Sequence, residues 1–124
     1  MIEMLYIASI LLVAIGIAHS YLGERYILIR LFRRDDLPTL FGSDDFTKRT
    51  LRFAWHITTV AWLGIAALLV HIANAEPSVA VIGNIVAVTF LLHGLIALAG
   101  SKGRHLSWPV FLAIAAIAFF ASNA

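Results

Sequence analysis

The sequence predicts an all-α integral membrane protein, built as four transmembrane helices in an antiparallel, up-down-up-down bundle. Hydrophobic residues make up 61% of the 124-residue chain, charged residues make up 13%, and the mean hydropathy is +0.93. Soluble domains are closer to half apolar and a quarter charged. Four apolar stretches approach the roughly 20 residues that cross a bilayer, and short connections make consecutive helices antiparallel neighbours. The whole chain, 1–124, is expected to form a single transmembrane domain.

The four predicted spans follow one another with short connections in all but one place. They cover 2–22, 51–73, 79–99 and 106–121. The last span is the shortest, and it fits a bilayer with little tilt or with local thinning.

The basic residues predict how the spans are oriented. All nine lie in the connection 23–50, at Arg52 just beyond it, or in the short connection 100–104, whereas the connection 74–78 has none. Basic loops stay on the cytoplasmic side, so both termini are expected in the periplasm of a bacterial-type inner membrane. Basic residues confined to such loops attract anionic lipid, and no nucleic-acid partner is expected.

The connection 23–50 is expected to be partly helical. The first helix continues beyond Leu22 to about Arg33, and Pro38 ends helical structure because the residue before a proline disfavours it. The turn at Gly42 leads to Asp44, which is expected to cap the second helix. The two helices therefore extend into the cytoplasm as a small hairpin.

Four of the five histidines are predicted to lie at one depth, just inside the cytoplasmic boundary. His19 and His56 are within five residues of charged residues that bound their spans, which is roughly 6–8 Å of helix. His71 lies at the opposite boundary. Ionisable groups at membrane depth usually face the bundle interior, and imidazole is the commonest metal ligand. The predicted layer consists of His19, His56, His93 and His105.

Two kinds of cofactor suit this layer. A b-type haem would take two of the histidines as axial ligands, with Arg52 and Arg104 pairing its propionates. A transition-metal ion such as zinc, copper or iron would take three or four histidines, with Glu24 as a further oxygen ligand. If haem is bound, a redox or electron-transfer role is expected, and nothing in the chain names a substrate. The absence of cysteine excludes disulfides, thiolate catalysis and iron–sulfur ligation.

Two other classes of function stay open. The histidines could handle protons, a quinone or an anionic lipid without any metal. The chain could instead be a structural accessory subunit of a membrane complex. Lipid is the expected partner in every case, and a four-helix unit this small has enough uncovered surface to form a homo-oligomer.

Two segments place basic, aromatic and histidine residues together at the cytoplasmic boundary. They are 51–56, Leu-Arg-Phe-Ala-Trp-His, and 103–108, Gly-Arg-His-Leu-Ser-Trp. Four short spans with membrane-embedded histidines resemble, in outline, the small membrane b-type cytochromes and the haem-binding membrane protoporphyrinogen oxidases. This is a likeness of architecture alone and transfers no function.

Overall fold

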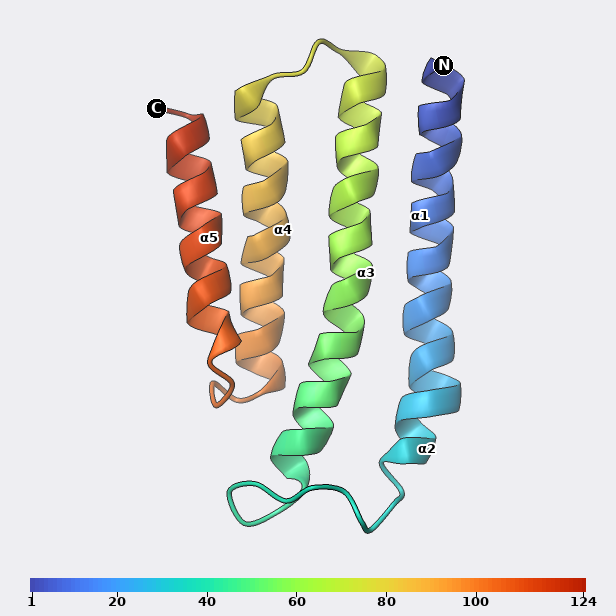
Figure 1. The fold of residues 1–124 in the computed structure, drawn as a ribbon, viewed down its shortest axis with the longest axis vertical. Helices are drawn as coiled ribbons and strands as arrows, with labels where there is room; N and C mark the ends of the chain where they lie inside the picture. The colour runs from blue at the N-terminus through green and yellow to red at the C-terminus, as the bar shows by residue number, and fades with distance from the viewer.

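The computed structural model describes every residue from Met1 to Ala124, and it is helical with no β-strand. This confirms the all-helical prediction. The helices, drawn in Figure 1, are α1 (Ile2–Leu22), the π-helix η1 (Gly23–Leu28), α2 (Ile29–Leu31), α3 (Asp45–Asn74), α4 (Val79–Gly100) and α5 (Ser107–Ser122).

Three helical segments are long and apolar enough to cross a membrane. They are Ile2–Leu31, Asp45–Asn74 and Val79–Gly100. The fourth helix, α5, is also apolar but has only 16 residues. At 1.5 Å per residue it is about 24 Å long, somewhat less than the roughly 30 Å of a bilayer's hydrocarbon core.

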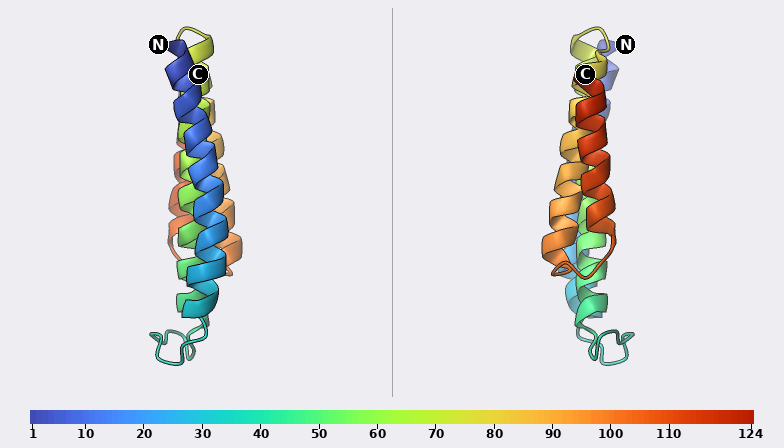
Figure 2. Two further views of the ribbon diagram at one scale, coloured as in Figure 1. Left: turned by 90° about the vertical axis from the view of Figure 1, so that its right-hand side faces the viewer. Right: turned by 90° about the vertical axis from the view of Figure 1, so that its left-hand side faces the viewer.

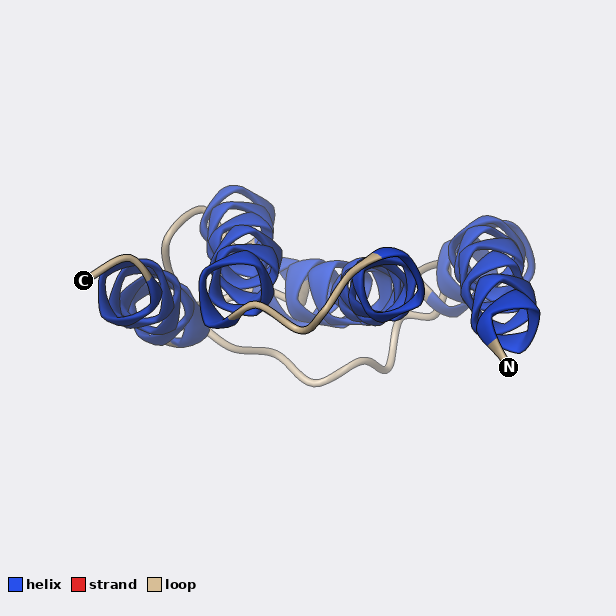
Figure 3. Cartoon of the chain, turned by 90° about the horizontal axis from the view of Figure 1, so that it is seen from above, coloured by secondary structure: helices blue, strands red, loops and turns tan.

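The four long helices lie side by side in chain order, and both termini are at the same end (Figure 1). Viewed from above they form a single row (Figure 3), and the side views show a thin slab (Figure 2). Helix α3 contacts α1 on one side and α4 on the other, while α5 contacts only α4. Because α1 touches neither α4 nor α5, the helices enclose no common interior.

Most of the apolar surface is therefore uncovered. Only 14 of 124 residues are buried, although 61% of the chain is hydrophobic. A contiguous apolar surface this large is typical of helices that lipid or another protein covers. The buried residues lie mainly where neighbouring helices approach closely.

Glycines permit the closest of these approaches. A Cβ atom at Gly23 would overlap the indole ring of Trp55, and one at Gly64 would overlap the side chain of Thr89. Small residues at such positions let helices pack without gaps inside a membrane. Gly23 thus joins the first helical segment to α3, and Gly64 joins α3 to α4.

The hairpin between α1 and α3 extends beyond the ends of α4 and α5 (Figure 1). Helix α3 begins at Asp45, with Asp44 at the predicted N-cap position. The expected cap differs in detail, because the Asp44 carboxylate pairs with Lys48 at 2.8 Å while Ser43 Oγ accepts from the Asp45 N–H at 3.3 Å. The sequence pattern does not predict the π-helical turn at Gly23–Leu28.

Candidate functional site

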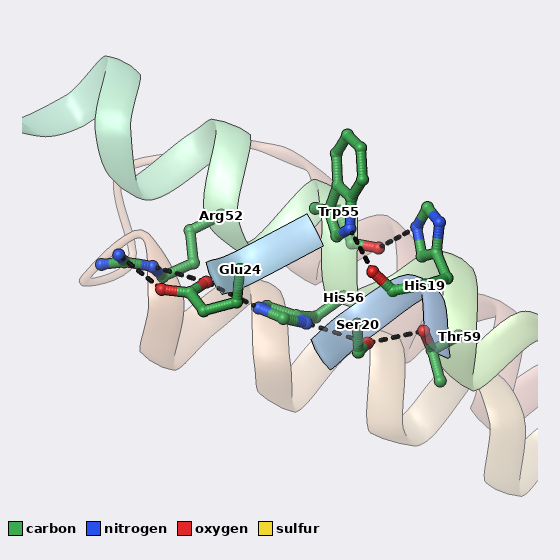
Figure 4. A network of polar contacts seen from close by, with 7 residues as sticks. All are labelled: His19, Ser20, Glu24, Arg52, Trp55, His56 and Thr59. Carbon is green, nitrogen blue, oxygen red and sulfur yellow. Dashed lines mark hydrogen bonds and ion pairs between the residues drawn. The ribbon is translucent and has the colours of Figure 1, made fainter. Parts of the chain in front are cut away.

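The interface between α1 and α3 contains an unbroken chain of polar contacts near the hairpin end (Figure 4). Arg52 donates two hydrogen bonds to the Glu24 carboxylate, at 2.7 and 3.2 Å. His56 Nε2 lies 3.1 Å from Oε2 of the same carboxylate. Glu24 is thus held between a guanidinium group and an imidazole ring, both from α3.

The chain continues from His56 toward the middle of the two helices. His56 Nδ1 lies 3.0 Å from Ser20 Oγ, which lies 2.6 Å from Thr59 Oγ1. The Thr59 hydroxyl donates to the Gly16 carbonyl oxygen at 3.0 Å. This chain of polar contacts therefore runs from a surface arginine to a backbone carbonyl inside the interface.

Helical spacing explains why these residues meet. Residues three or four apart share one face of a helix, and each helical segment contributes three positions at this spacing. From the first segment these are Gly16, Ser20 and Glu24, and from α3 they are Arg52, His56 and Thr59. When the two helices pack along these faces, the six positions form one column.

The donor and acceptor capacities of the groups decide in which direction each hydrogen bond of this chain of polar contacts points. The Gly16 carbonyl only accepts, so the single hydrogen of the Thr59 hydroxyl points to it. Ser20 must then donate to Thr59, and it can only accept from His56. His56 Nδ1 therefore carries a hydrogen.

The contact between His56 and Glu24 then requires one proton of its own. Without it, the lone pair of Nε2 would face a carboxylate oxygen 3.1 Å away. Either the ring is an imidazolium or the carboxyl group is protonated. The two hydrogen bonds from Arg52 suit the carboxylate form of Glu24, and a hydrogen on His56 Nε2 would then complete the contact. His56 and Glu24 are the two groups of this hydrogen-bond chain that can gain or lose a proton.

A groove of about 600 Å³ lies beside His56. It lies between α3 and α4, and Arg52 and His56 line its inner part. Lys48, Arg49 and Asp45 line it closer to the hairpin. The medium at this end of the helices therefore has a path to the imidazole ring.

His19 lies on the same interface but has separate partners. Its ring stacks on Trp55 with centroids 4.6 Å apart and planes at 2°. The ring of Trp62 is 5.0 Å away on a tilted plane, and His19 Nε2 contacts the Trp55 carbonyl oxygen at 3.3 Å. His19 is thus a packing residue between two tryptophans.

His93 is buried on α4, with 6% of its surface exposed. Its Nδ1 lies 2.7 Å from the Thr89 carbonyl oxygen, and Phe90 and Phe111 pack against the ring at 5.2 and 5.4 Å. Because a carbonyl only accepts, Nδ1 carries the hydrogen. His93 also lines an apolar pocket of about 230 Å³ between α3 and α4.

His105 and His71 both organise turns. His105 Nδ1 lies 2.8 Å from Ser107 Oγ at the start of α5, and its ring packs on Phe46 and Phe53. His71 Nε2 accepts from the Ser78 N–H at 3.2 Å, which holds the turn before α4.

The four predicted ligands therefore occupy different places. His19 and His56 lie between α1 and α3, His93 packs against α5, and His105 lies beside the start of α3. No three histidine, aspartate or glutamate side chains are grouped so that they could hold a metal ion. The row of helices keeps His19 of α1 away from α4 and α5, whereas His56 of α3 has its partners on the first helical segment, at Ser20 and Glu24.

The residues as placed do not form a haem pocket either. The His19 ring is covered by Trp55, and both nitrogens of His56 have protein partners. Arg52 is paired with Glu24, while Arg104 lies over the Phe41 ring at 5.5 Å. Neither arginine faces a histidine that is free to bind iron.

The sequence points to Glu24, Arg52 and His56, but the part played by hydroxyl groups emerges only from the structure. Ser20 has no acidic residue next to it that would mark it as a nucleophile, and Thr59 belongs to no sequence motif. Their spacing from Glu24 and His56 is nevertheless a usable signal, since each lies three or four residues away on the same helix face.

Comparisons with known proteins add no relative to this description. The chain matches no protein-family model, no curated protein and no solved structure.

Proposed function

We propose that this chain is a multi-pass protein of the bacterial inner membrane that takes up and releases a proton at the Glu24–His56 pair. In this proposal the four helices cross the membrane up-down-up-down, with both termini in the periplasm. Three helices of sufficient length and apolarity support this placement, as do basic residues restricted to one side. The pair then lies at the cytoplasmic boundary.

The observation that carries the proposal is the directed hydrogen-bond chain from Glu24 to Gly16. The hydrogens of Thr59, Ser20 and His56 Nδ1 each have one acceptor, and the contact between His56 and Glu24 joins the two groups of the hydrogen-bond chain that can bind or lose a proton. Carboxylate and imidazole groups commonly carry protons in membrane proteins. The groove beside His56 supplies the exchange path.

The short extent of the hydrogen-bond chain indicates that the protein binds a proton and does not conduct protons across the membrane. Beyond Gly16 the next polar contact on this interface is Ser9 Oγ to the Ala66 carbonyl, at 3.1 Å. Ser9 precedes Gly16 by about two helical turns, which is roughly 10 Å of helix, and no polar side chain bridges that interval. Loss of the proton would leave the imidazole lone pair facing the carboxylate, and would thus weaken the attachment of α1 to α3.

Proton uptake by the purified protein tests the proposal directly. A dilute detergent solution is titrated from about pH 9 to 4, the range that covers imidazole and carboxyl groups, and bound protons are counted with a pH indicator. We expect His56→Gln to remove one proton-binding step, and Glu24→Gln to move that step to lower pH because the imidazolium loses its carboxylate partner. His71→Gln is the control for loss of an imidazole, because its ring only holds a turn.

The outcomes separate cleanly. A Glu24→Gln protein that takes up protons over the same pH range as the unsubstituted chain would mean that the pair does not act as a unit and would overturn the proposal. In liposomes with a potassium diffusion potential we expect no proton leak above that of empty vesicles. A rapid leak that Ser20→Ala abolishes would replace one-sided binding with conduction.

A further inference from the structure

Three arginines around Tyr26 have no acidic partner. The other cations of the hairpin are paired: Arg34 with Asp36, Lys48 with Asp44, Arg49 with Asp45, and Arg52 with Glu24. Arg25, Arg30 and Arg33 form no ion pair, and all three are exposed. Their charge is therefore uncompensated within the chain.

The π-helical turn brings two of these arginines to one ring. In an α-helix, residues five apart point about 140° away from each other. In a π-helix the hydrogen bonds join residues five apart, so such residues lie nearly above one another. The turn at Gly23–Leu28 contains Arg25 and leads directly to Arg30. Their guanidinium carbons lie 5.8 and 5.7 Å from the centre of the Tyr26 ring.

Arg33 completes a shallow basic depression. The depression has a volume of about 380 Å³ and is lined by Arg25, Tyr26, Ile29, Arg30 and Arg33. Tyr26 and Ile29 are 51% and 40% exposed. The depression thus combines three free guanidinium groups with an aromatic and an aliphatic surface, directly after the apolar run that ends at Leu22.

We propose that this depression binds the phosphate headgroup of an anionic phospholipid. Guanidinium groups recognise phosphate through paired hydrogen bonds, and basic clusters next to a transmembrane helix attract anionic lipid. Tyr26 suits the membrane–water boundary, and Ile29 offers a contact for the start of an acyl chain. A soluble phosphate compound would use the arginines but would leave both of these surfaces in water.

Lipid binding at this place rests on the membrane placement proposed above, but not on the proton site. The test uses the full chain in a neutral detergent, mixed with phosphatidylglycerol or phosphatidylcholine, and counts retained lipids by native mass spectrometry. We expect retained phosphatidylglycerol to exceed phosphatidylcholine by roughly fivefold or more, about 1 kcal/mol of preference. The variant Arg25→Gln/Arg30→Gln is expected to lose this preference.

The matched control is Lys102→Gln/Arg104→Gln. It removes the same charge from the same side of the protein, and neither residue forms an ion pair. Its preference for phosphatidylglycerol is expected to stay close to that of the unsubstituted chain. Equal losses in the two double variants would reduce the effect to overall charge and overturn the site, as would no loss in either.

Two further measurements separate lipid binding from phosphate binding and from the proton site. Binding of millimolar inorganic phosphate by a protein that retains no phosphatidylglycerol would show that the arginines bind phosphate alone, and would overturn the lipid assignment. Glu24→Gln removes the proton site but keeps the three arginines, so we expect its lipid retention to be unchanged. The proton proposal can therefore fail while the lipid proposal holds, and the lipid proposal can fail while the proton proposal holds.

Discussion

His19 and Trp55 hold α1 against α3 through two reciprocal contacts. Their rings stack at 4.6 Å, and Trp55 Nε1 donates to the His19 carbonyl oxygen at 3.0 Å while His19 Nε2 contacts the Trp55 carbonyl oxygen. Gly23 leaves the space that the indole occupies. This pair sets the register that brings His56 opposite Ser20 and Glu24.

Gly23→Ala is expected to destabilise the protein by about 1–3 kcal/mol, because the new methyl group overlaps the Trp55 indole and a packed interface has little room to shift. Unfolding of the purified protein in mixed detergent micelles measures this cost. Gly16→Ala is the control, since its Cβ would meet Thr59 Cγ2 at 3.2 Å, a contact that a small movement relieves. A Gly23→Ala protein as stable as the Gly16→Ala protein would contradict the packing described.

The hydrogen positions at the proton site are open to nitrogen-15 NMR of labelled histidine. We expect His56 Nδ1 to carry a hydrogen because it donates to Ser20, and Nε2 to carry one while it contacts the Glu24 carboxylate. His71 provides the comparison: its Nε2 accepts from Ser78, so only Nδ1 should be protonated. Ser20→Ala removes the acceptor of the Nδ1 hydrogen and should move the His56 signals while leaving those of His71 in place.

The predicted haem or metal ion has its own direct test. The visible spectrum and metal content of the purified protein would reveal a bound haem, zinc, copper or iron. Because the histidines lie apart, we expect neither the visible spectrum nor the metal content to change in His56→Ala or His93→Ala. A Soret band that either substitution removes would support haem and a redox role, and would require the helices to close around it.

The proposed topology can be mapped by labelling single introduced cysteines, because the chain has no cysteine of its own that would react. A cysteine at Glu76→Cys, in the turn between α3 and α4, should react with a membrane-impermeant maleimide in intact cells. One at Asp35→Cys, in the hairpin, should react only after the membrane is opened. Both positions are exposed, so the reverse labelling pattern would invert the orientation and place the proton site at the periplasmic face.

A titration of the hairpin tests the Arg34–Asp36 pair. The two hydrogen bonds from Arg34 lower the pKa of Asp36 below its ordinary value of 3.8. A group with a depressed pKa stabilises the fold above its ordinary pKa, and that contribution is lost as the pH falls through the lower value. Arg34→Gln should raise the carbon-13 titration midpoint of the Asp36 carboxyl toward 3.8. Arg33→Gln, which makes no contact with Asp36, should leave it unchanged.

The order of apolar and charged residues along the chain was enough to predict the helices. Helix α1 covers Ile2–Leu22 as expected, and Pro38 and Gly42 lie in the predicted break before α3. These features depend on local chemistry: run length, helix-stopping residues and the energetic cost of charge in a membrane. The depth of each histidine followed from the same counting, because depth along a helix depends only on sequence position.

Which side chains meet was decided by the tertiary structure alone. Helix rotation directs His56 to Ser20 and Glu24 but directs His19 to Trp55, although both histidines belong to one interface. The row of helices then keeps His93 and His105 away from His19, because a residue on α4 or α5 cannot reach α1. The π-turn that gathers Arg25 and Arg30 around Tyr26 likewise depends on a change of helical pitch. Lateral order, rotation and pitch arise from packing between helices, and residue spacing within one helix does not encode them.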